Sequence, residues 1–375
     1  MDSGIVSSAH LPTAFGEFNI HVLPEKVKLG VVKGRPAATF LEHYAMVPTA
    51  FDPHKPVAIH VHHLDIFEDL FCRGSGKELS VPKQILKKLS NGENGILLYV
   101  DRLDDATKAQ LKDHVDKPEK LETAAERRIV DYFANYLRVE NQKIVATGAM
   151  VAKRPAAKTN IETDLGPFEV RRMDEIVRVD FPEAALRSLF PRDAGIPADR
   201  SPIFLKHLAH YALIAPRQKG AKAAPFVRIH SSCATGDINS SYRCDCGLQF
   251  RKALGMIAEH GGAVIYHDAE GRGIHSLAIK MHFYKLHREG FDTYTSMTSF
   301  GYAEDCRDYK PVGKLLREIG MTKIVLLTNN PRKMADVAKA GIEIAKTARV
   351  RMSKVPEETK AYLDAKKTKG GHKLK

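Results

Sequence analysis

Short apolar runs bounded by polar residues recur along the chain, and they predict buried strands. In the second half these runs occupy Phe226 to Ile229, Ala263 to Tyr266 and Ile324 to Leu327. Between the runs, two segments carry apolar residues three or four positions apart, which gives a helix one apolar face. These faces are formed by Leu248, Ala253, Leu254, Ile257 and Ala258, and by Val312, Leu315, Leu316 and Ile319. Strands that alternate with helices predict an α/β domain, with an α+β domain as the alternative.

The first half repeats parts of the same pattern. VAIHVHH at 57–63 resembles FVRIHSS at 226–232, and GILLYVDR at 95–102 resembles GAVIYHDA at 262–269. A glycine followed two positions later by phenylalanine also opens each half, at Gly16 and Phe18 and at Gly166 and Phe168. These matches indicate a tandem duplication, although short β-rich runs also resemble one another by chance.

A basic, proline-containing segment separates the two halves. VAKRPAAKTN, at 151–160, has the composition of a linker. We therefore predict a first domain at 1–150 and a catalytic domain at 161–375. Opposite the three clustered cysteines of the second half, the first half offers only Cys72, so it could not build the same metal site. We interpret the first domain as a degenerate, related copy that is structural, regulatory or part of an interface.

The net charge of +13 predicts an anionic partner, either nucleic acid or a phosphorylated small molecule. Part of the excess lies in the lysines of the last ten residues, which are interpreted as a solvated end. The sequence carries no zinc-finger, RNA-recognition or helix-turn-helix signature, so we expect no nucleic-acid partner. No apolar stretch reaches the roughly 20 residues of a membrane span, and the start MDSGIVSSAH lacks a secretory pattern. We therefore expect a cytoplasmic protein without a membrane partner.

The strongest chemical signal is the segment HSSCATGDINSSYRCDCG. It supplies three thiolates, from Cys233, Cys244 and Cys246, within fourteen residues. Zinc prefers four tetrahedral ligands, so three protein thiolates leave one position for water. His230 lies close by and is read as a substrate contact or a residue behind the ligands. The alternative is a set of buried free thiols or a structural zinc site.

Two further motifs could bind a nucleotide. In AEGRGIHSL, at 269–277, the N–H groups of a helix start and Arg272 could hold an anion, and Glu270 could pair with a ring N–H. In LLTNNPRK, a strand ends at Thr328 and Lys333 lies just inside the next helix, an arrangement that suits phosphate. Glycine-rich turns and Asn-Asn-Pro helix starts are also common without any ligand.

The segment FGYAEDCRDYKPVG places a carboxylate beside a guanidinium in a loop before a helix. Asp305 could move a proton and Arg307 could bind phosphate. The alternative is a local ion pair, which is the most frequent arrangement of such residues.

Taken together, HSSCATGD, RCDCG, EGRGI, DCRDY and LLTNNPRK resemble in order and spacing the motifs of GTP cyclohydrolase II. The resemblance covers roughly Thr163 to Leu374, and LPTAFGEF near the N-terminus resembles the opening of that family. It implies a zinc-dependent hydrolase of riboflavin biosynthesis, which converts GTP to a ribosylaminopyrimidine phosphate, formate and pyrophosphate. Further expectations are a homodimer and Mg²⁺ accompanying the triphosphate.

The resemblance also implies roles for individual residues. Cys233, Cys244 and Cys246 would hold one zinc ion. Asp305 falls on the family's proton acceptor, and Arg307 falls on the proposed nucleophile, which would attack the α-phosphorus. The match of Tyr284 to a catalytic tyrosine is looser. The remaining positions that match or flank nucleotide contacts are Arg228, His230, Ser231, Ser232, Gln249, Glu270, Gly271, Arg272, Thr293, Thr328 and Lys333.

Several positions depart from the family pattern near the pocket that reads the base. Ser232 stands where the family usually has Glu, and Asp268 and Ala269 stand where it has Arg-Gln. His275 and Ser276 replace a single glycine. The same apparatus could therefore open a different base, as in a uracil-catabolism branch that is thought to act on a uracil nucleotide.

The mechanism predicted for either substrate is attack of zinc-bound water on a ring carbon of the nucleotide. A hypothesis from another class is an inactive nucleotide-binding sensor or scaffold. Retention of the three thiolates together with Asp305 and Arg307 argues against it, because a sensor could lose its metal ligands and keep the phosphate site.

Overall fold

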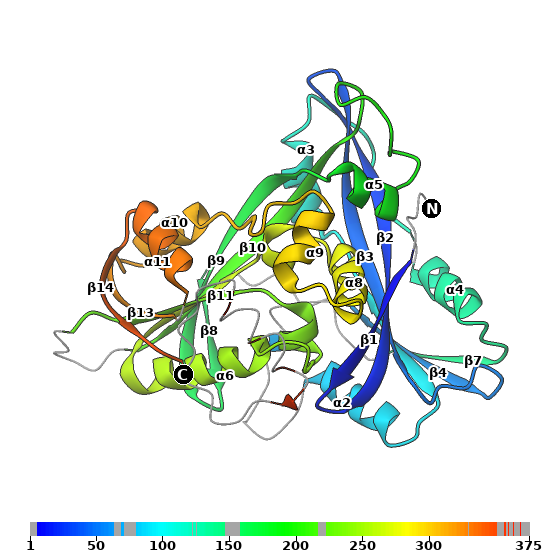
Figure 1. Cartoon of the computed structure of the whole chain (residues 1–375), viewed down its shortest axis with the longest axis horizontal. Coiled ribbons are helices and arrows are strands. Elements are labelled where there is room, and N and C mark those ends of the chain that lie inside the picture. The colour runs from blue at the N-terminus through cyan, green and yellow to red at the C-terminus, as the bar shows by residue number, and fades with distance from the viewer. Residues whose placement is uncertain are drawn as a thin grey trace.

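The computed structural model describes residues 6–63, 69–70, 80–121, 123–124, 126–146, 158–216, 223–328 and 330–350, together with residues 356, 357, 359, 363 and 368. Within these residues, fourteen strands join in a single sheet. In Figure 1 the first half lies on the right and most of the second half on the left.

The first half contains seven strands and three helices among the described residues. Its strands are β1 (Ser7–Thr13), β2 (Gly16–Val32), β3 (Arg35–Pro48), β4 (Val57–His63), β5 (Gly95–Val100), β6 (Lys117–Pro118) and β7 (Gln142–Ala146). Its helices are α2 (Val81–Ser90), α3 (Asp105–Lys112) and α4 (Glu126–Tyr136).

The described part of the second half follows a similar order. Its strands are β8 (Lys158–Thr163), β9 (Gly166–Val179), β10 (Ile203–Ala215), β11 (Phe226–Ser231), β12 (Gly262–His267), β13 (Lys323–Leu327) and β14 (Glu343–Ala348). Its helices are α5 (Glu183–Leu189), the π-turn η1 (Ala234–Ile238), α6 (Cys246–His260), α7 (Glu270–Gly273), α8 (Leu277–Arg288), α9 (Thr293–Ser299), α10 (Lys310–Glu318) and α11 (Pro331–Lys339).

Four strands on each side of the middle of the sheet follow the same order, and β14 adds a fifth strand on the side of the second half. The order is β14-β13-β11-β12-β10-β3-β5-β4-β7, and the central strands β10 and β3 pair in parallel. Reading outward from β3 gives β5, β4 and β7, and reading outward from β10 gives β12, β11 and β13. Equivalent elements of the two halves therefore lie at equivalent places in one continuous sheet.

Histidine–carboxylate pairs recur at matching places in the two halves. In each half a histidine within a central strand pairs with a glutamate, and a second histidine pairs with an aspartate seven residues later. The pairs are His43–Glu25 and His62–Asp69 in the first half, and His210–Glu175 and His230–Asp237 in the second. The resemblance between the halves thus extends from strand order to side-chain contacts.

The second half carries helices on both faces of its strands. Ile229 and Ile265 belong to the core formed with α10, whereas Val264 and Tyr266 face α6. Figure 1 shows α10 and α11 on one side of these strands and α6 on the other. Because successive strand residues point to opposite faces, strands covered on both sides are continuously apolar. This arrangement confirms the predicted α/β class.

The helix faces follow the predicted pattern with one exception. Helix α6 buries Phe250 and Ile257, and α10 buries Leu315 and Leu316. Leu248 was predicted on the buried face but is 37% exposed. It lies two residues from Phe250, which is about 200° around a helix, so the two side chains point in opposite directions.

The two halves share a hydrophobic core beneath α8. Phe18 and Tyr44 of the first half belong to the same buried cluster as Met281 and Phe283 of α8. Helix α8 packs on β1 and β2, as Figure 1 shows near the centre of the molecule. The first half is thus packed directly against a helix of the second half.

The start of the second half differs from the prediction of a linker at 151–160. Strand β8 begins at Lys158, so the described end of the segment predicted as a linker is already strand. The rest of that segment, Cys72 and the lysines of the C-terminal end lie outside the described residues. Among the described helices, none is long and apolar enough to cross a membrane.

Candidate active site

A cavity of about 260 Å³ opens at the carboxyl ends of β11, β12 and β13. Every residue that the sequence analysis assigned to the metal, catalytic or nucleotide-binding sets lines this cavity. The lining also includes residues that were not assigned, among them Arg243, Lys280, His287 and Arg332. The fold therefore brings motifs spread over about a hundred residues to one place, at the edge where α/β sheets usually bind ligands.

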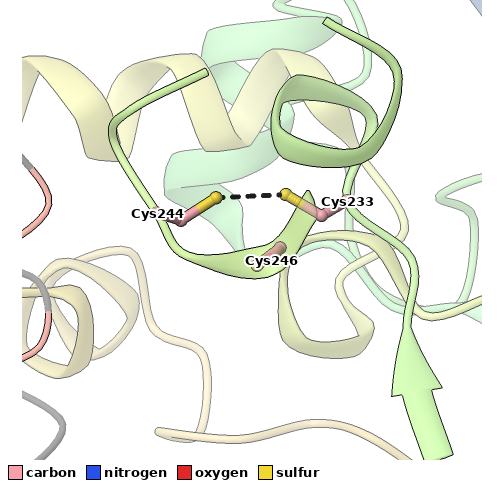
Figure 2. Close-up of side chains that lie close together, drawn as sticks. All are labelled: Cys233, Cys244 and Cys246. Carbon is pink, nitrogen blue, oxygen red and sulfur yellow. Dashed lines mark hydrogen bonds between the residues drawn. The ribbon is translucent and has the colours of Figure 1, made fainter. Parts of the chain in front are cut away.

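The three cysteines converge from the end of a strand, a loop and the start of a helix. Cys233 follows β11 and caps the π-turn, Cys244 lies in the next loop, and Cys246 begins α6. The sulfurs of Cys233 and Cys244 are 3.6 Å apart, and all three lie within 4.8 Å of one another (Figure 2). Zn–S bonds of about 2.3 Å at tetrahedral angles place sulfurs about 3.8 Å apart. The cluster therefore fits a thiophilic ion such as zinc.

The backbone of the π-turn lies close against these sulfurs. Gly236 donates its N–H to Cys233 Sγ at 3.4 Å. A Cβ atom at Gly236 would lie 2.8 Å from Cys244 Sγ and 3.1 Å from the Cβ of Cys246. Only glycine allows this approach without moving the sulfurs.

The surroundings of Cys233 favour its thiolate. Hydrogen bonds with the thiols of Cys244 and Cys246 lower the pKa of Cys233 well below its usual value, against the opposing effect of burial. Lys280 Nζ lies 3.2 Å from Cys233 Sγ and adds a stabilising charge. The hydrogen bonds to Cys233 raise the pKa of Cys244 and the pKa of Cys246 well above their usual values, so without a metal ion this environment favours a single thiolate, at Cys233.

Glu270 is held by the protein on both of its carboxylate oxygens. Its Oε1 accepts from Lys280 Nζ at 2.7 Å, and its Oε2 accepts from Ala234 N at 2.6 Å. Burial raises the pKa of Glu270, although Lys280 opposes this effect. Glu270 thus joins α8 to the π-turn that follows Cys233, here called the cysteine turn. It also lines the cavity, where the N–H of a bound ring would compete with Lys280 and Ala234 for its carboxylate.

The segment after Glu270 does not begin a regular helix. Gly271 and Arg272 have φ values of 60° and 65°, which interrupt the four-residue α7, and the regular helix α8 begins only at Leu277. The predicted regular helix start is therefore wrong, whereas anion binding by this segment stays a prediction, since Gly271 and Arg272 line the cavity. Arg272 instead lies 4.1 Å from the centre of the Tyr294 ring and donates to Glu304 O.

Tyr284 faces the cysteine turn from α8. Its hydroxyl is 3.0 Å from Thr235 Oγ1, and Thr235 Oγ1 is 3.5 Å from Cys233 Sγ. Burial raises the pKa of Tyr284 well above its usual value, so the phenol is neutral at neutral pH. Arg243 lies 5.2 Å from the centre of the Tyr284 ring. Lys280 precedes Tyr284 by four residues, a spacing that places both on one helix face and could have indicated Lys280.

Asp305 and Arg307 form the ion pair that the sequence left as an alternative to catalysis. Arg307 Nε donates to Asp305 Oδ1 at 2.8 Å, and its Nη1 donates to Ser231 Oγ at 3.2 Å. Burial raises the pKa of Asp305, but the hydrogen bonds and charge of Arg307 outweigh it and leave the pKa below its usual value. Asp305 is therefore ionised at neutral pH, and it fixes the plane of the guanidinium at the cavity wall.

Several residues expected to contact the nucleotide also hold the cavity wall together. Arg228 donates to Leu327 O at 3.0 Å and to Gln249 Oε1 at 2.6 Å, and Lys333 Nζ donates to Ile229 O at 2.9 Å. His230 is paired with Asp237 at 3.0 Å. Arg228 thus links β11 to β13, and Lys333 links α11 to β11, and both bring their charge to the wall of the cavity.

The charge of the lining favours an anion. Seven basic side chains line the cavity against three carboxylates. The basic residues are Arg228, Arg243, Arg272, Lys280, Arg307, Arg332 and Lys333, and the acidic residues are Glu270, Glu304 and Asp305. A cleft with this excess concentrates phosphorylated ligands.

Comparison with known proteins identifies similar sequences. The family model for GTP cyclohydrolase II matches residues 4–143 and 203–350, so it covers segments of both halves. A protein named riboflavin biosynthesis protein RibBA from Thermotoga maritima is 37% identical over 212 residues, which are 55% of this chain and 53% of that protein. A protein named GTP cyclohydrolase-2 from Vibrio vulnificus is 37% identical over 166 residues, which are 44% of this chain and 83% of that protein. The chain thus spans about half the length of the first relative and most of the second.

Proposed function

Because the chain belongs to the GTP cyclohydrolase II family, we propose that it opens the ring of GTP by hydrolysis and releases formate and pyrophosphate. One observation carries this proposal: three cysteine sulfurs, the Asp305–Arg307 pair and Tyr284 line a single cationic cavity. A ring-opening hydrolase needs an activated water, a proton donor and cations for the phosphates, and these residue types can provide all three.

Zinc is the ion proposed for Cys233, Cys244 and Cys246, because their sulfurs have a separation suited to tetrahedral coordination. Bound there, zinc would supply a water of lowered pKa and would polarise the ring. Lys280, on α8, supports the thiolate of Cys233, and Glu270, at the start of α7, holds Lys280 in place.

The other side chains divide into proton carriers and phosphate ligands in this proposal. Neutral Tyr284 can donate a proton to the opening ring, while ionised Asp305 orients Arg307 toward the α-phosphate and can accept a proton from it. Arg228, Arg272 and Lys333 are proposed to neutralise the remaining phosphates, with Thr328 at the end of β13.

The organisation of the whole chain enters the same proposal. Residues 1–150 are proposed to be a degenerate copy of the catalytic domain at 161–375, which agrees with the shared strand order and the recurring histidine–carboxylate pairs. A homodimer, Mg²⁺ with the triphosphate and a cytoplasmic location stay predictions.

Incubation of zinc-loaded protein with GTP and, separately, with UMP tests the substrate. We expect the ultraviolet spectrum of GTP to change, with one formate and one pyrophosphate released per product detected by mass, and we expect UMP to persist. The Cys244→Ser variant, prepared identically, controls for a contaminating enzyme. Consumption of UMP with intact GTP would favour the uracil-nucleotide alternative, and consumption of neither would favour the sensor alternative.

A further inference from the structure

A buried glutamate of the first half contacts the start of an active-site helix. Glu42, on β3, accepts from the Leu277 N–H at 2.8 Å and from the Ala278 N–H at 2.9 Å. It also accepts from the Ser276 hydroxyl at 2.8 Å. The first N–H groups of a helix lack partners within the helix, and a carboxylate is stabilised beside them. Glu42 therefore fixes the start of α8 from the other half of the molecule.

Helix α8 carries side chains that reach the cysteine turn. Lys280 and Tyr284, two and six residues after Ala278, contact Cys233 and Thr235 respectively. A shift or rotation of the helix start would move both side chains relative to the sulfurs. The geometry at the metal site thus depends on a contact with the first half.

A second contact fixes the end of the π-turn that follows Cys233. Tyr99 donates its hydroxyl to Asn239 Oδ1 at 2.8 Å, and Asn239 Nδ2 donates to Ala234 O at 3.1 Å. Tyr99 is stacked on Tyr44 with ring centres 4.2 Å apart, and all three side chains are fully buried. Through Asn239, strands β3 and β5 of the first half hold the turn that presents the first cysteine.

The backbone of the first half also contacts the loop that leads to the second cysteine. Ala14 donates its N–H to Ser240 O at 3.0 Å, and Tyr242 donates to Pro12 O at 2.9 Å. Arg243, next to Cys244, donates its Nε to His10 O at 2.7 Å. The loop between the cysteines is therefore anchored on β1 and on the turn that follows it.

Among the residues that the structure describes, no residue of the second half makes the corresponding contact with a helix start of the first half. The N–H of Glu42 donates to Asp101, and the N–H of Ala209 donates to Asp268, each at 3.2 Å, which makes Ala209 the counterpart of Glu42. An alanine cannot hold a helix start, and α3 of the first half is capped by its own Asp104. The carboxylate thus occurs only on the half that faces the described cysteine site.

We infer that the first half is an obligatory intramolecular partner of the active site, and that Glu42 is a positioning residue by which it holds the start of α8. A buried carboxylate with a purely structural role would contribute only to the stability of the fold. A positioning residue also changes the chemical step, because Lys280 and Tyr284 lose their alignment with the cysteine turn. The effect on turnover rests on the proposed function, whereas the effect on the helix does not.

The full-length, zinc-loaded variants Glu42→Ala and Glu42→Gln test this inference, with Glu25→Gln as the matched control. Glu25 is a buried carboxylate of the same half, and its hydrogen bonds within the described part of the chain come from His43 and the Ala124 N–H, not from α8. In Glu42→Gln, the amide oxygen can keep the bonds of Ser276 and Ala278, but the amide NH₂ faces the Leu277 N–H. Glu42→Gln therefore keeps the shape of the side chain and loses one acceptor. It serves as the test if Glu42→Ala fails to fold.

The readouts are kcat and KM for GTP, hydrogen exchange of residues 277–288, and the thiolate-to-metal absorption of the cobalt-substituted protein. A misplacement of about 1 Å can slow catalysis on the order of 100-fold. We expect Glu42→Ala to lose kcat on that order with KM changed less, faster exchange in α8, and retained cobalt–thiolate absorption. Glu42→Gln should be intermediate, and Glu25→Gln should match the wild type in kcat and in α8 exchange.

Three outcomes would overturn the inference. The first is hydrogen exchange in α8 of Glu42→Ala at the wild-type rate. The second is a wild-type kcat in both Glu42 variants, and the third is a loss of kcat in Glu25→Gln as large as that in Glu42→Gln. If the wild type does not turn over GTP, the proposed function fails, and the exchange and cobalt measurements still decide whether Glu42 positions the helix.

Discussion

At the scale of single residues, the metal site has no ligand to spare among the described side chains. Cys233, Cys244 and Cys246 form the group there that could hold a metal ion, and each offers one sulfur. We predict about one zinc per chain in the wild type and its loss on Cys233→Ser, Cys244→Ser or Cys246→Ser. Metal analysis of dialysed protein measures this. Serine for the exposed Cys306 is the control and should leave the zinc content unchanged.

Gly236 gives a second test of the same site, because no cysteine is changed. In Gly236→Ala the new methyl group would lie 2.8 Å from Cys244 Sγ, so the sulfur must move and zinc affinity should fall at least about tenfold, the range seen when residues around metal ligands are altered. Competition with a zinc chelator measures this affinity. Gly255→Ala is the matched control in α6, since nothing lies within 4 Å of its Cβ position. It should keep the wild-type affinity and add about 0.5–1 kcal/mol of stability.

Arg307 distinguishes a catalytic guanidinium from a simple ion pair. Arg307→Lys keeps the charge beside Asp305 but cannot reproduce the planar arrangement of Nε and Nη1 that contacts Asp305 and Ser231. We expect kcat for GTP to fall by about 100-fold or more, with a smaller change in KM. Steady-state kinetics of Arg307→Lys and of the exposed control Arg251→Lys measure this. Equal kinetics in the Arg307 variant and the wild type would leave Arg307 as a structural partner of Asp305.

At the scale of elements, the sequence was informative where one local pattern determined the structure. The apolar runs at 226–229, 263–266 and 324–327 lie within β11, β12 and β13, because a strand covered on both faces is apolar throughout. The segment 269–277 was predicted to open a helix, but Gly271 and Arg272 adopt positive φ values that no hydrophobic pattern encodes. Such conformations depend on tertiary contacts, here the approach of Gly273 to the backbone of Cys306 and Arg307.

In the candidate site, too, some residues could be predicted from local sequence patterns, and others depend on tertiary contacts. Its residues were found because they stand in motifs of distinctive residue types or match the nucleotide contacts of the family that these motifs resemble, and all of them line the cavity. Lys280 and Arg243 were missed, because a lysine on a helix and an arginine in a loop look like solvated residues. Their places at the site depend on long-range contacts, with α8 held by Glu42 and the loop held by the backbone of His10.

At the scale of the whole molecule, the continuous sheet and the shared core predict that the two halves unfold together. Phe18 of β2 is fully buried in the cluster that includes residues of α8. Phe18→Ala should destabilise the protein by about 3–5 kcal/mol. Because β3 pairs with β10, this loss should lower the urea midpoint for circular dichroism and the midpoint for thiol exposure at Cys233, Cys244 and Cys246 by the same amount.

The matched variant for this experiment is Phe168→Ala, which removes the corresponding phenylalanine of β9 from a core of the second half. Both variants should be measured on metal-free protein, since bound metal would protect the thiols by itself. If the two halves unfold as one cooperative unit, each substitution must shift both the circular-dichroism transition and the thiol-exposure transition. If Phe18→Ala shifted only an early change in circular dichroism and left thiol exposure at the wild-type midpoint, the first half would unfold independently. It could then not be a structural part of the catalytic half, and Glu42 would have to act through a contact that forms and breaks without affecting the global fold.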